Sequence, residues 1–220
     1  LSFSVGSALL FLSKQSKKRI NFIEQLTLII LVYVLTSLFI AVPFYLSNYQ
    51  VTFLNSLFEA ISGVTGTGFS IFDNIKYLDP TLILWRSSSQ WIGGFYFLIF
   101  LILIFSNKQF NYKMNELSYS GDGSINSENN IKDLLFRIFI LYSVLSFIIF
   151  LLLNLSDIRM FNSLNLSMSL ISAGGFIPTN SLDKIIQSNP QKLVLIFSLL
   201  ISLLNFFLIL NIFEKKIFIH

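Results

Sequence analysis

Two short glycine-rich segments contain the residues whose types and spacing suggest chemistry. Glycine adopts backbone angles that residues with a Cβ resist, so such a segment can turn successive carbonyl oxygens toward one axis. Rings of carbonyl oxygens can replace the hydration shell of a potassium ion. The alternative for one segment alone is a loop that lets helices approach closely, since glycine is frequent in membrane helices. Each segment is therefore a candidate cation filter, and the candidate residues, whose backbone carbonyls would bind potassium, are Thr65, Gly66, Thr67, Gly68, Ser172, Ala173, Gly174 and Gly175.

The two segments belong to a repeated sequence. Leu54–Phe69 aligns without gaps on Phe161–Phe176, and both copies contain Asn-Ser-Leu near the start and Gly-Phe at the end. Self-similarity at a fixed period indicates a repeated structural unit, which favours two matched filter segments over a chance loop. Two registers remain open for the second copy. The gap-free alignment pairs Gly68 with Gly175, whereas matching the Thr-Gly step to Ala-Gly pairs it with Gly174.

The residues before the first segment predict a short helix. Phe53–Val64 is an apolar stretch of about twelve residues, and at 1.5 Å per residue such a helix crosses about half of a membrane. We expect it to enter from outside and to return as irregular backbone, which is tolerated at that depth only inside protein or along a watery cavity. Its C-terminus aims a partial negative charge at the membrane centre, which favours a cation.

The helices that follow each segment are expected to begin alike. Asp79 precedes Pro80, and Asn189 precedes Pro190. An Asx side chain at the N-cap supplies an acceptor, and proline at the first helical position loses no hydrogen bond there. Both dipeptides therefore predict the start of a longer helix.

Composition places these elements in a membrane. The chain has 220 residues, 54% hydrophobic and only 12% charged, whereas soluble domains average about 25% charged. One crossing needs about 20 helical residues. Pro43 divides the first long apolar stretch into a helix and a following segment, and the shorter run Leu1–Ser13 is interpreted as the truncated inner end of an earlier helix. The charge-free stretches are 25–58, 87–107, 138–156 and 193–213.

The basic residues indicate a topology. Most of them alternate between helix ends in a way that puts them on one face, which the positive-inside rule assigns to the cytoplasm. We therefore expect a multi-pass protein of the cell membrane, whether inner or plasma membrane. The net charge of +4 follows from this topology, so no nucleic-acid partner is expected. The residues on that face are Lys14, Lys17, Lys18, Arg19, Lys108, Lys113, Lys132, Lys215 and Lys216.

The predicted fold class is an all-α membrane protein of tandem helix–pore loop–helix repeats. Gly and Asn clusters between the halves interrupt the hydrophobic pattern and mark a solvated linker. The domain prediction is the end of a preceding helix with a basic turn at 1–20, a first repeat at 21–106, a cytoplasmic linker at 107–130, a second repeat at 131–214 and the start of another cytoplasmic segment at 215–220.

Three polar residues inside apolar surroundings are candidate supports for the filter. Glu59 lies in the short helix, where a charge is costly unless it is paired or reaches water; it either braces the filter by accepting hydrogen bonds or faces an outer vestibule. Arg86 either braces the filter or anchors its helix at the interface. Asn205 either bonds a neighbouring helix or lines the cavity under the filter.

These motifs resemble the TrkH/TrkG family of potassium-uptake proteins. The resemblance covers nearly the whole chain, from Lys17 to Asn211, and its most specific element is Trp85–Gly94, which reads Trp-Arg-Ser-Ser-Ser-Gln-Trp-Ile-Gly-Gly. Phe58–Gly68 resembles the first family repeat and Ser172–Phe176 the second. Ala173 departs from the hydroxyl residue expected in the family, which removes hydroxyl support there but leaves a carbonyl.

The resemblance implies four such repeats around one pore, in a potassium-channel-like fold. This chain supplies two of them. It further implies a homodimer and a cytoplasmic nucleotide-binding regulatory subunit similar to TrkA. The predicted function is potassium uptake, with potassium as the substrate and no cofactor. One alternative is an accessory or degenerate membrane subunit that conducts nothing by itself. A membrane enzyme is disfavoured, because the sequence has no Cys, one terminal His and no paired carboxylates at helical spacing.

Overall fold

The computed structural model describes residues 22–105 and 128–203, and within these ranges every regular element is helical. Three predictions concern residues outside the described ranges: the helix end at Leu1–Ser13, most of the 107–130 linker, and the role of Asn205. The all-α prediction is confirmed for the rest. The helices are α2 (Phe22–Tyr45), α3 (Phe53–Val64), α4 (Pro80–Phe105), α5 (Glu128–Leu155), α6 (Met160–Ile171) and α7 (Asn189–Ser202), with short 3₁₀ turns at Ile75–Tyr77 and Leu182–Lys184.

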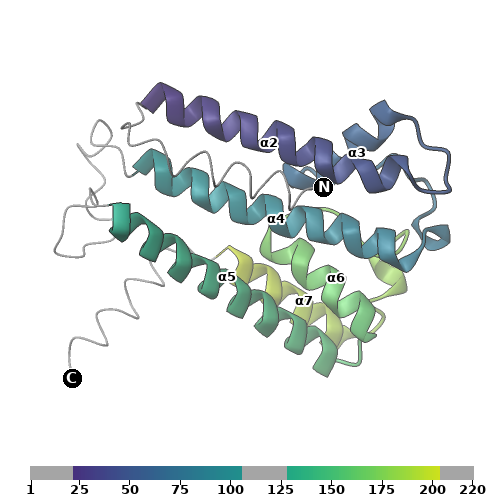
Figure 1. Ribbon diagram of the computed structural model, residues 1–220. Coiled ribbons are helices and arrows are strands. Elements are labelled where there is room, and N and C mark those ends of the chain that lie inside the picture. The colour runs from purple at the N-terminus through teal and green to yellow at the C-terminus, as the bar shows by residue number, and fades with distance from the viewer. Residues whose placement is uncertain (1–21, 106–127, 204–220) are drawn as a thin grey trace, which may run out of the picture.

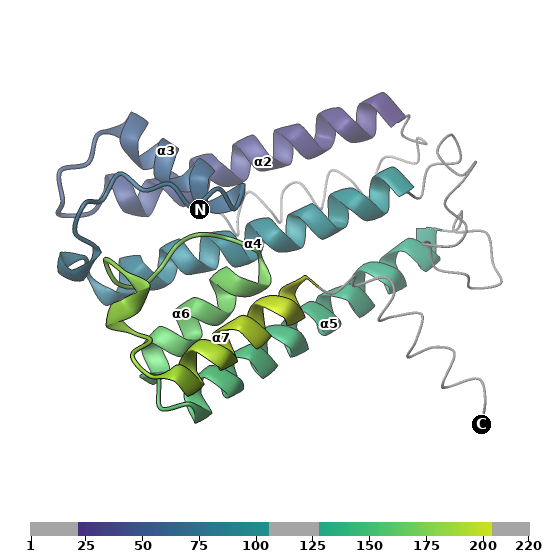
Figure 2. The same ribbon diagram turned by 180° about the vertical axis from the view of Figure 1, so that it is seen from behind.

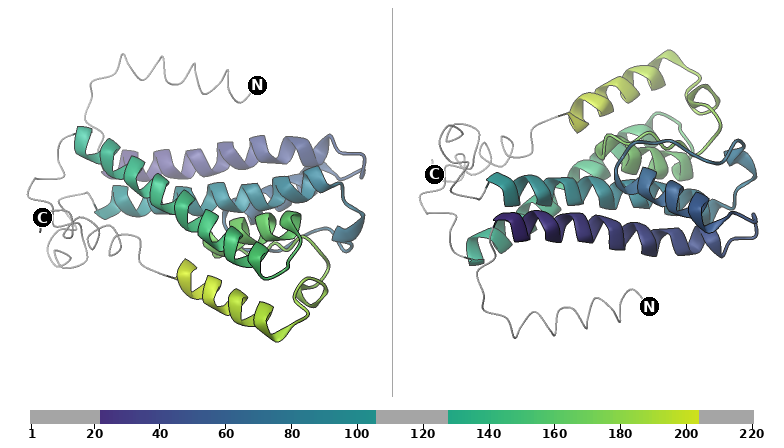
Figure 3. Two further views of the ribbon diagram at one scale, coloured as in Figure 1. Left: turned by 90° about the horizontal axis from the view of Figure 1, so that it is seen from below. Right: turned by 90° about the horizontal axis from the view of Figure 1, so that it is seen from above.

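Three long helices, α2, α4 and α5, run side by side, and two short ones lie beside them (Figure 1). The short helices, α3 and α6, are each 12 residues long, against 24 to 28 residues for the long ones. Views from behind, from below and from above place both short helices toward the same end of the long ones (Figures 2 and 3). A helix of the predicted length is therefore confirmed at Phe53–Val64.

Helix α4 is the central element. It packs on α2 and α3 from one half of the chain and on α5 and α6 from the other. Gly93 permits this contact, because a Cβ at that position would overlap the carbonyl of Val64 at the end of α3. A Cβ on Gly94 would lie 2.7 Å from the Cβ of Ser172, directly after α6. These two glycines allow close packing, and α4 abuts the ends of both short helices.

The helix starts follow local capping rules, with one correction. Thr52 caps α3 by accepting a hydrogen bond from the Asn55 N–H at 3.3 Å. The prediction of Asn189 as the N-cap of α7 is wrong by one residue. Ser188 is the N-cap, and it forms a capping box with Gln191, so both of its polar groups are bonded within the first turn. The capping box of Ser188 and Gln191 is therefore favoured over Asn189 as the start of the helix.

The outer surfaces of α2 and α5 are apolar. Two of the described helical segments, Ile23–Tyr45 and Asp133–Leu155, are long and apolar enough to cross a membrane, and only 17% and 22% of their most apolar windows are buried. A core helix of a soluble protein would bury most of such a surface. The exposed side chains include Ile30, Val34, Phe136 and Phe147, at 54 to 65% exposure. Lipid is the solvent that suits this surface.

Candidate functional site

Both short helices end in the same backbone motif. At the end of α3, the Gly66 N–H donates to the Gly63 carbonyl at 3.0 Å and the Thr67 N–H to the Ser62 carbonyl at 3.1 Å. At the end of α6, the Ala173 N–H donates to the Leu170 carbonyl at 3.0 Å and the Gly174 N–H to the Ser169 carbonyl at 2.8 Å. These paired bonds define a Schellman motif, which satisfies the last carbonyls of a helix.

The motif follows the gap-free alignment of the repeats. Gly66 has φ +69° and Ala173 has φ +52°, so the left-handed residue occupies the same aligned position in both copies. Thr67 and Gly174 then donate the equivalent hydrogen bonds. The second glycine with positive φ in the first segment is Gly68, at +77°. The local backbone is thus matched between the copies through Thr67 and Gly174.

Ala173 carries backbone strain that its counterpart avoids. A left-handed conformation costs a residue with a Cβ about 1 kcal/mol or more, and glycine escapes that cost. We expect Ala173→Gly to stabilise the folded protein by about 0.5–1 kcal/mol, partly offset by the greater entropy of glycine in the unfolded chain. The measurement is the thermal midpoint in detergent, and an unchanged or lowered midpoint contradicts the expectation.

The two glycine-rich segments contact each other through their backbones. A Cβ built on Gly68 would lie 2.5 Å from the Gly175 Cα and 2.8 Å from its nitrogen. A Cβ on Gly175 would lie 3.1 Å from the Gly68 Cα. Only glycine fits on the Gly68 side of this contact. The fold therefore brings together two segments that are more than a hundred residues apart in the sequence.

Hydroxyl groups hold the first segment against its helix. The Ser62 hydroxyl donates to the Phe69 carbonyl at 2.6 Å, and the Thr67 hydroxyl lies 3.1 Å from the Ser62 hydroxyl. The Thr65 and Thr67 hydroxyls are 3.3 Å apart. Because Phe69 directly follows the segment, these bonds join both ends of the segment to one turn of α3.

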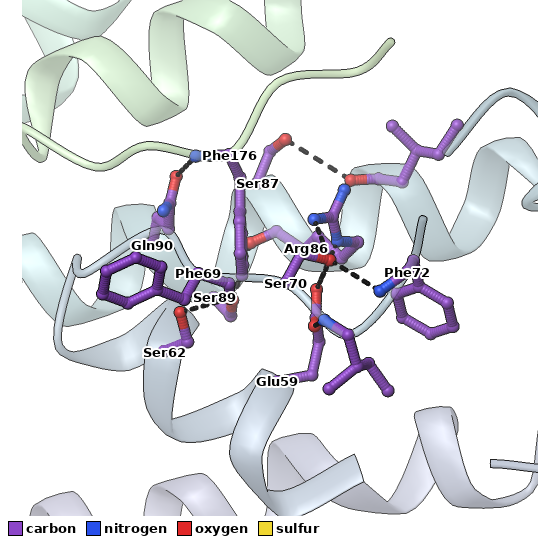
Figure 4. A network of polar contacts seen from close by, with 12 residues as sticks. Glu59, Ser62, Phe69, Ser70, Phe72, Arg86, Ser87, Ser89, Gln90 and Phe176 are labelled. Atoms are coloured by element: carbon purple, nitrogen blue, oxygen red, sulfur yellow. Dashed lines mark hydrogen bonds and ion pairs between the residues drawn. The ribbon is translucent and has the colours of Figure 1, made fainter. Parts of the chain in front are cut away.

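A buried ion pair lies behind the first segment (Figure 4). Arg86 donates from Nε to Oε1 of Glu59 at 2.7 Å, and their side chains are 1% and 0% exposed. Glu59 also accepts from the Ser70 hydroxyl at 3.1 Å and from the Ile71 N–H at 2.9 Å. Glu59 therefore does not face an open vestibule among the described residues. It accepts one hydroxyl and one backbone hydrogen bond from residues that follow the first segment.

Arg86 also contacts the second half of the chain. Its guanidinium lies 4.2 Å from the ring centre of Phe176, which directly follows the second segment, and Nη2 donates to the Ser70 hydroxyl at 3.0 Å. A cation over an aromatic face contributes about 0.5–2 kcal/mol. At 1% exposure, Arg86 is not an interfacial anchor. It joins the residues that follow the two segments.

Gln90 is a site residue that the sequence analysis did not select. Its Oε1 accepts from the Ser169 hydroxyl at 2.8 Å and from the Phe176 N–H at 3.2 Å, and its side chain is fully buried. Gln90 follows Arg86 by one helical turn, so both project from the same face of α4. The spacing of four residues between two polar side chains in an apolar helix is the sequence signal that could have identified Gln90 as a site residue.

Around the two segments, the described part of the chain presents mainly backbone carbonyls and hydroxyl groups. Among the described residues, no group of three or more His, Asp and Glu side chains could hold a metal ion. The acidic residue nearest the segments, Glu59, is engaged by Arg86, Ser70 and Ile71. The groups that remain are backbone carbonyls and hydroxyls, which suit an alkali cation.

Comparison with known proteins gives relatives that transport cations. An uncharacterised cation transporter of Methanocaldococcus jannaschii is 31% identical over 68% of this chain and 31% of its own length. The Trk system potassium uptake protein TrkG of Escherichia coli is 29% identical over 42% of this chain and 19% of its own. The corresponding protein TrkI of Halomonas elongata is 37% identical over 32% of this chain and 14% of its own. The chain spans about a third or less of these relatives.

The match to a family model extends much further along the chain than any of these pairwise matches. The model of the TrkH cation transport proteins matches residues 1–218. The resemblance noted for Trp85–Gly94 and for the glycine-rich segments is thereby confirmed at the level of the family. A family of membrane transporters also agrees with the apolar outer faces of α2 and α5. This chain belongs to the TrkH family of cation transport proteins.

Proposed function

We propose that this chain forms part of a potassium-uptake pore, in which the segments Thr65–Gly68 and Ser172–Gly175 are two filter strands. The observation that carries the proposal is the pair of identical helix ends whose glycine segments meet at Gly68 and Gly175. Two relatives are named as potassium uptake proteins, which supports potassium as the cation. Carbonyl oxygens replace water around the ion, and no group performs covalent chemistry.

The proposed architecture is a tandem helix–pore loop–helix repeat. Helices α2, α3 and α4 form the first repeat, and α5, α6 and α7 form the second. Two further repeats close the ring, since two quarters leave the pore open on one side. We propose a homodimer in the cell membrane and a cytoplasmic nucleotide-binding regulator similar to TrkA.

The proposed filter register pairs Gly68 with Gly175. The matched Schellman bonds support it, because they align Thr67 with Gly174 and so place the next residues at equivalent positions. Gly66 and Ala173 then contribute equivalent carbonyls, and the missing hydroxyl at Ala173 leaves that carbonyl available.

Glu59 and Arg86 are proposed to position the first strand without binding the ion. Their pair lies behind Ser70 and Ile71, immediately after the strand. A paired guanidinium and carboxylate add little net charge near the pore, while three hydrogen bonds to Ser70 and Ile71 fix the chain there. Asn205 is proposed to support the cavity below the filter or a neighbouring helix.

An accessory subunit that does not conduct is the second candidate. The exposed apolar side chains of α2 and α5 would suit packing on partner helices as well as on lipid. The matched glycine segments favour the pore, because a packing subunit has no need of two hydrogen-bonded turns that meet at glycine.

Potassium uptake by the full-length protein separates the two candidates. Expressed in cells that lack their own potassium uptake, the pore restores growth at low potassium and accumulates rubidium as a tracer. An accessory subunit restores neither. Restoration only when a second transport protein is supplied overturns the proposed pore.

A further inference from the structure

We propose that Gln90 is a positioning residue for the second filter segment, so that the second helix of one repeat holds the filter strand of the next. The inference rests on the proposed pore. Gln90 contacts Ser169, three residues before the segment Ser172–Gly175, and Phe176, directly after it. One side-chain oxygen therefore ties the two ends of the segment together.

The orientation of the Gln90 amide is fixed by its partners. The Phe176 N–H can only donate, so the carbonyl oxygen Oε1 must face it. The amide nitrogen Nε2 is buried and has no partner among the described residues. A Cβ built on Gly174 would lie 2.7 Å from this Nε2 atom. Gln90 thus acts as an acceptor toward Phe176 (Figure 4). The absence of a Cβ at Gly174 leaves room for the amide beside the strand.

The second repeat has no acceptor of its own at the equivalent place. Glu59 accepts the Ile71 N–H after the first segment. The residue that aligns with Glu59 in the repeat is Leu166, which is 2% exposed and lies in the apolar core. A leucine cannot accept a hydrogen bond, and Pro178, which aligns with Ile71 in the same register, has no N–H to donate, so the Glu59 contact has no counterpart in the second repeat. The buried N–H after the second segment is that of Phe176, and its acceptor comes from another element. Gln90 of α4 supplies it.

The second helix of the second repeat does not replace this contact. Counted from Pro190 as Arg86 and Gln90 are counted from Pro80, the equivalent residues of α7 are Ile196 and Leu200. Both are apolar and more than half exposed. The second segment therefore receives this hydrogen-bond acceptor from α4. The same helix contacts the residues after the first segment through Arg86. One rigid helix fixes both strands relative to each other.

The test uses the full-length protein and measures the ratio of potassium to sodium uptake. Gln90→Met keeps the volume and removes the acceptor, which leaves the Phe176 N–H buried without a partner. We expect this ratio to fall about tenfold, which corresponds to ~1.4 kcal/mol. Gln90→Glu keeps an acceptor oxygen in either protonation state, and we expect the ratio to stay within about twofold of wild type.

Ser87→Ala is the matched control. Ser87 is buried in the same helix, and its hydroxyl donates only to the Ile83 carbonyl of that helix. Its loss changes buried polarity without touching a filter segment, so the uptake ratio stays at the wild-type value. A merely structural role for Gln90 lowers the amount of folded protein but leaves the ratio of the remaining transport unchanged.

The outcomes separate this inference from the proposed function. If the wild type takes up no potassium, the pore itself is wrong. If the wild type is selective and Gln90→Met keeps its ratio, the pore stands and the positioning role is wrong. If Gln90→Met yields no folded protein, Ser169→Ala removes one of the two bonds instead, and a fall of about threefold is expected. An unchanged ratio in Ser169→Ala overturns the inference.

Discussion

Arg86→Met is expected to abolish accumulation of the folded protein. The substitution leaves the Glu59 carboxylate fully buried beside the apolar core, with only Ser70 and Ile71 as partners. Breaking a buried ion pair by removing one member costs about 3–5 kcal/mol, and a typical domain is stable by only about 5–15 kcal/mol. The measurements are the yield of monodisperse protein in detergent and its thermal midpoint.

The double variant Glu59→Leu with Arg86→Met is the informative comparison. It removes both charges together, and such replacements are often neutral or stabilising. We expect it to recover folded protein but not potassium uptake, since Ser70 and Ile71 lose their acceptor. Lys192→Met is the matched control: it removes an exposed cation at the start of α7 and changes stability by about 0.5 kcal/mol or less. Wild-type stability of Arg86→Met alone would show that the pair does not hold the site together.

The Glu59–Arg86 pair shows what sequence reasoning could reach. Each residue was selected because a charge inside an apolar helix must be paired or hydrated. The pairing itself joins α3 to α4 across 27 positions of sequence, and no local pattern specifies such a contact. The identity of the candidates was therefore available from the sequence, while their mutual contact required the fold.

The short helix α3 was predictable for a different reason. Residues adjacent to the helix determine where it begins and ends. Thr52 is the N-cap, and Gly66 is the left-handed residue of the motif that ends the helix. The predicted start of α7 was wrong by one residue because Ser188 and Asn189 are adjacent and each could act as the N-cap. Ser188 is the N-cap because it forms a capping box with Gln191, and this Ser-x-x-Gln spacing is also visible in the sequence.

Gln90 was missed because its function depends on contacts between the two halves. A glutamine in an apolar helix is compatible with helix packing, with a cavity lining or with a filter support, and the sequence does not distinguish them. Only the placement of α6 against α4 brings Ser169 and Phe176 to its oxygen. Long-range contacts of this kind are the part of the site that composition and spacing leave open.

Gly68→Ala is expected to abolish potassium uptake, whereas Gly66→Ala is expected only to reduce it. Both glycines have positive φ, at +77° and +69°, so both substitutions introduce about 1–2 kcal/mol of backbone strain. They differ in their surroundings. The added Cβ would lie 2.5 Å from the Gly175 Cα at the first position, but 3.6 Å from the nearest atom, the Ser172 carbonyl oxygen, at the second.

The difference between the two variants therefore isolates the contact between the strands. Overlap with a backbone cannot be relieved by turning a side chain, and forced overpacking costs about 1–3 kcal/mol in addition. We expect rubidium uptake by Gly68→Ala to be at least about tenfold below that of Gly66→Ala. Gly68→Asp, which adds a carboxylate at the same place, should be equally inactive. Equal uptake by the two alanine variants would mean that Gly68 and Gly175 do not meet in the conducting pore, and unchanged uptake in Gly68→Asp would overturn the filter assignment of this segment.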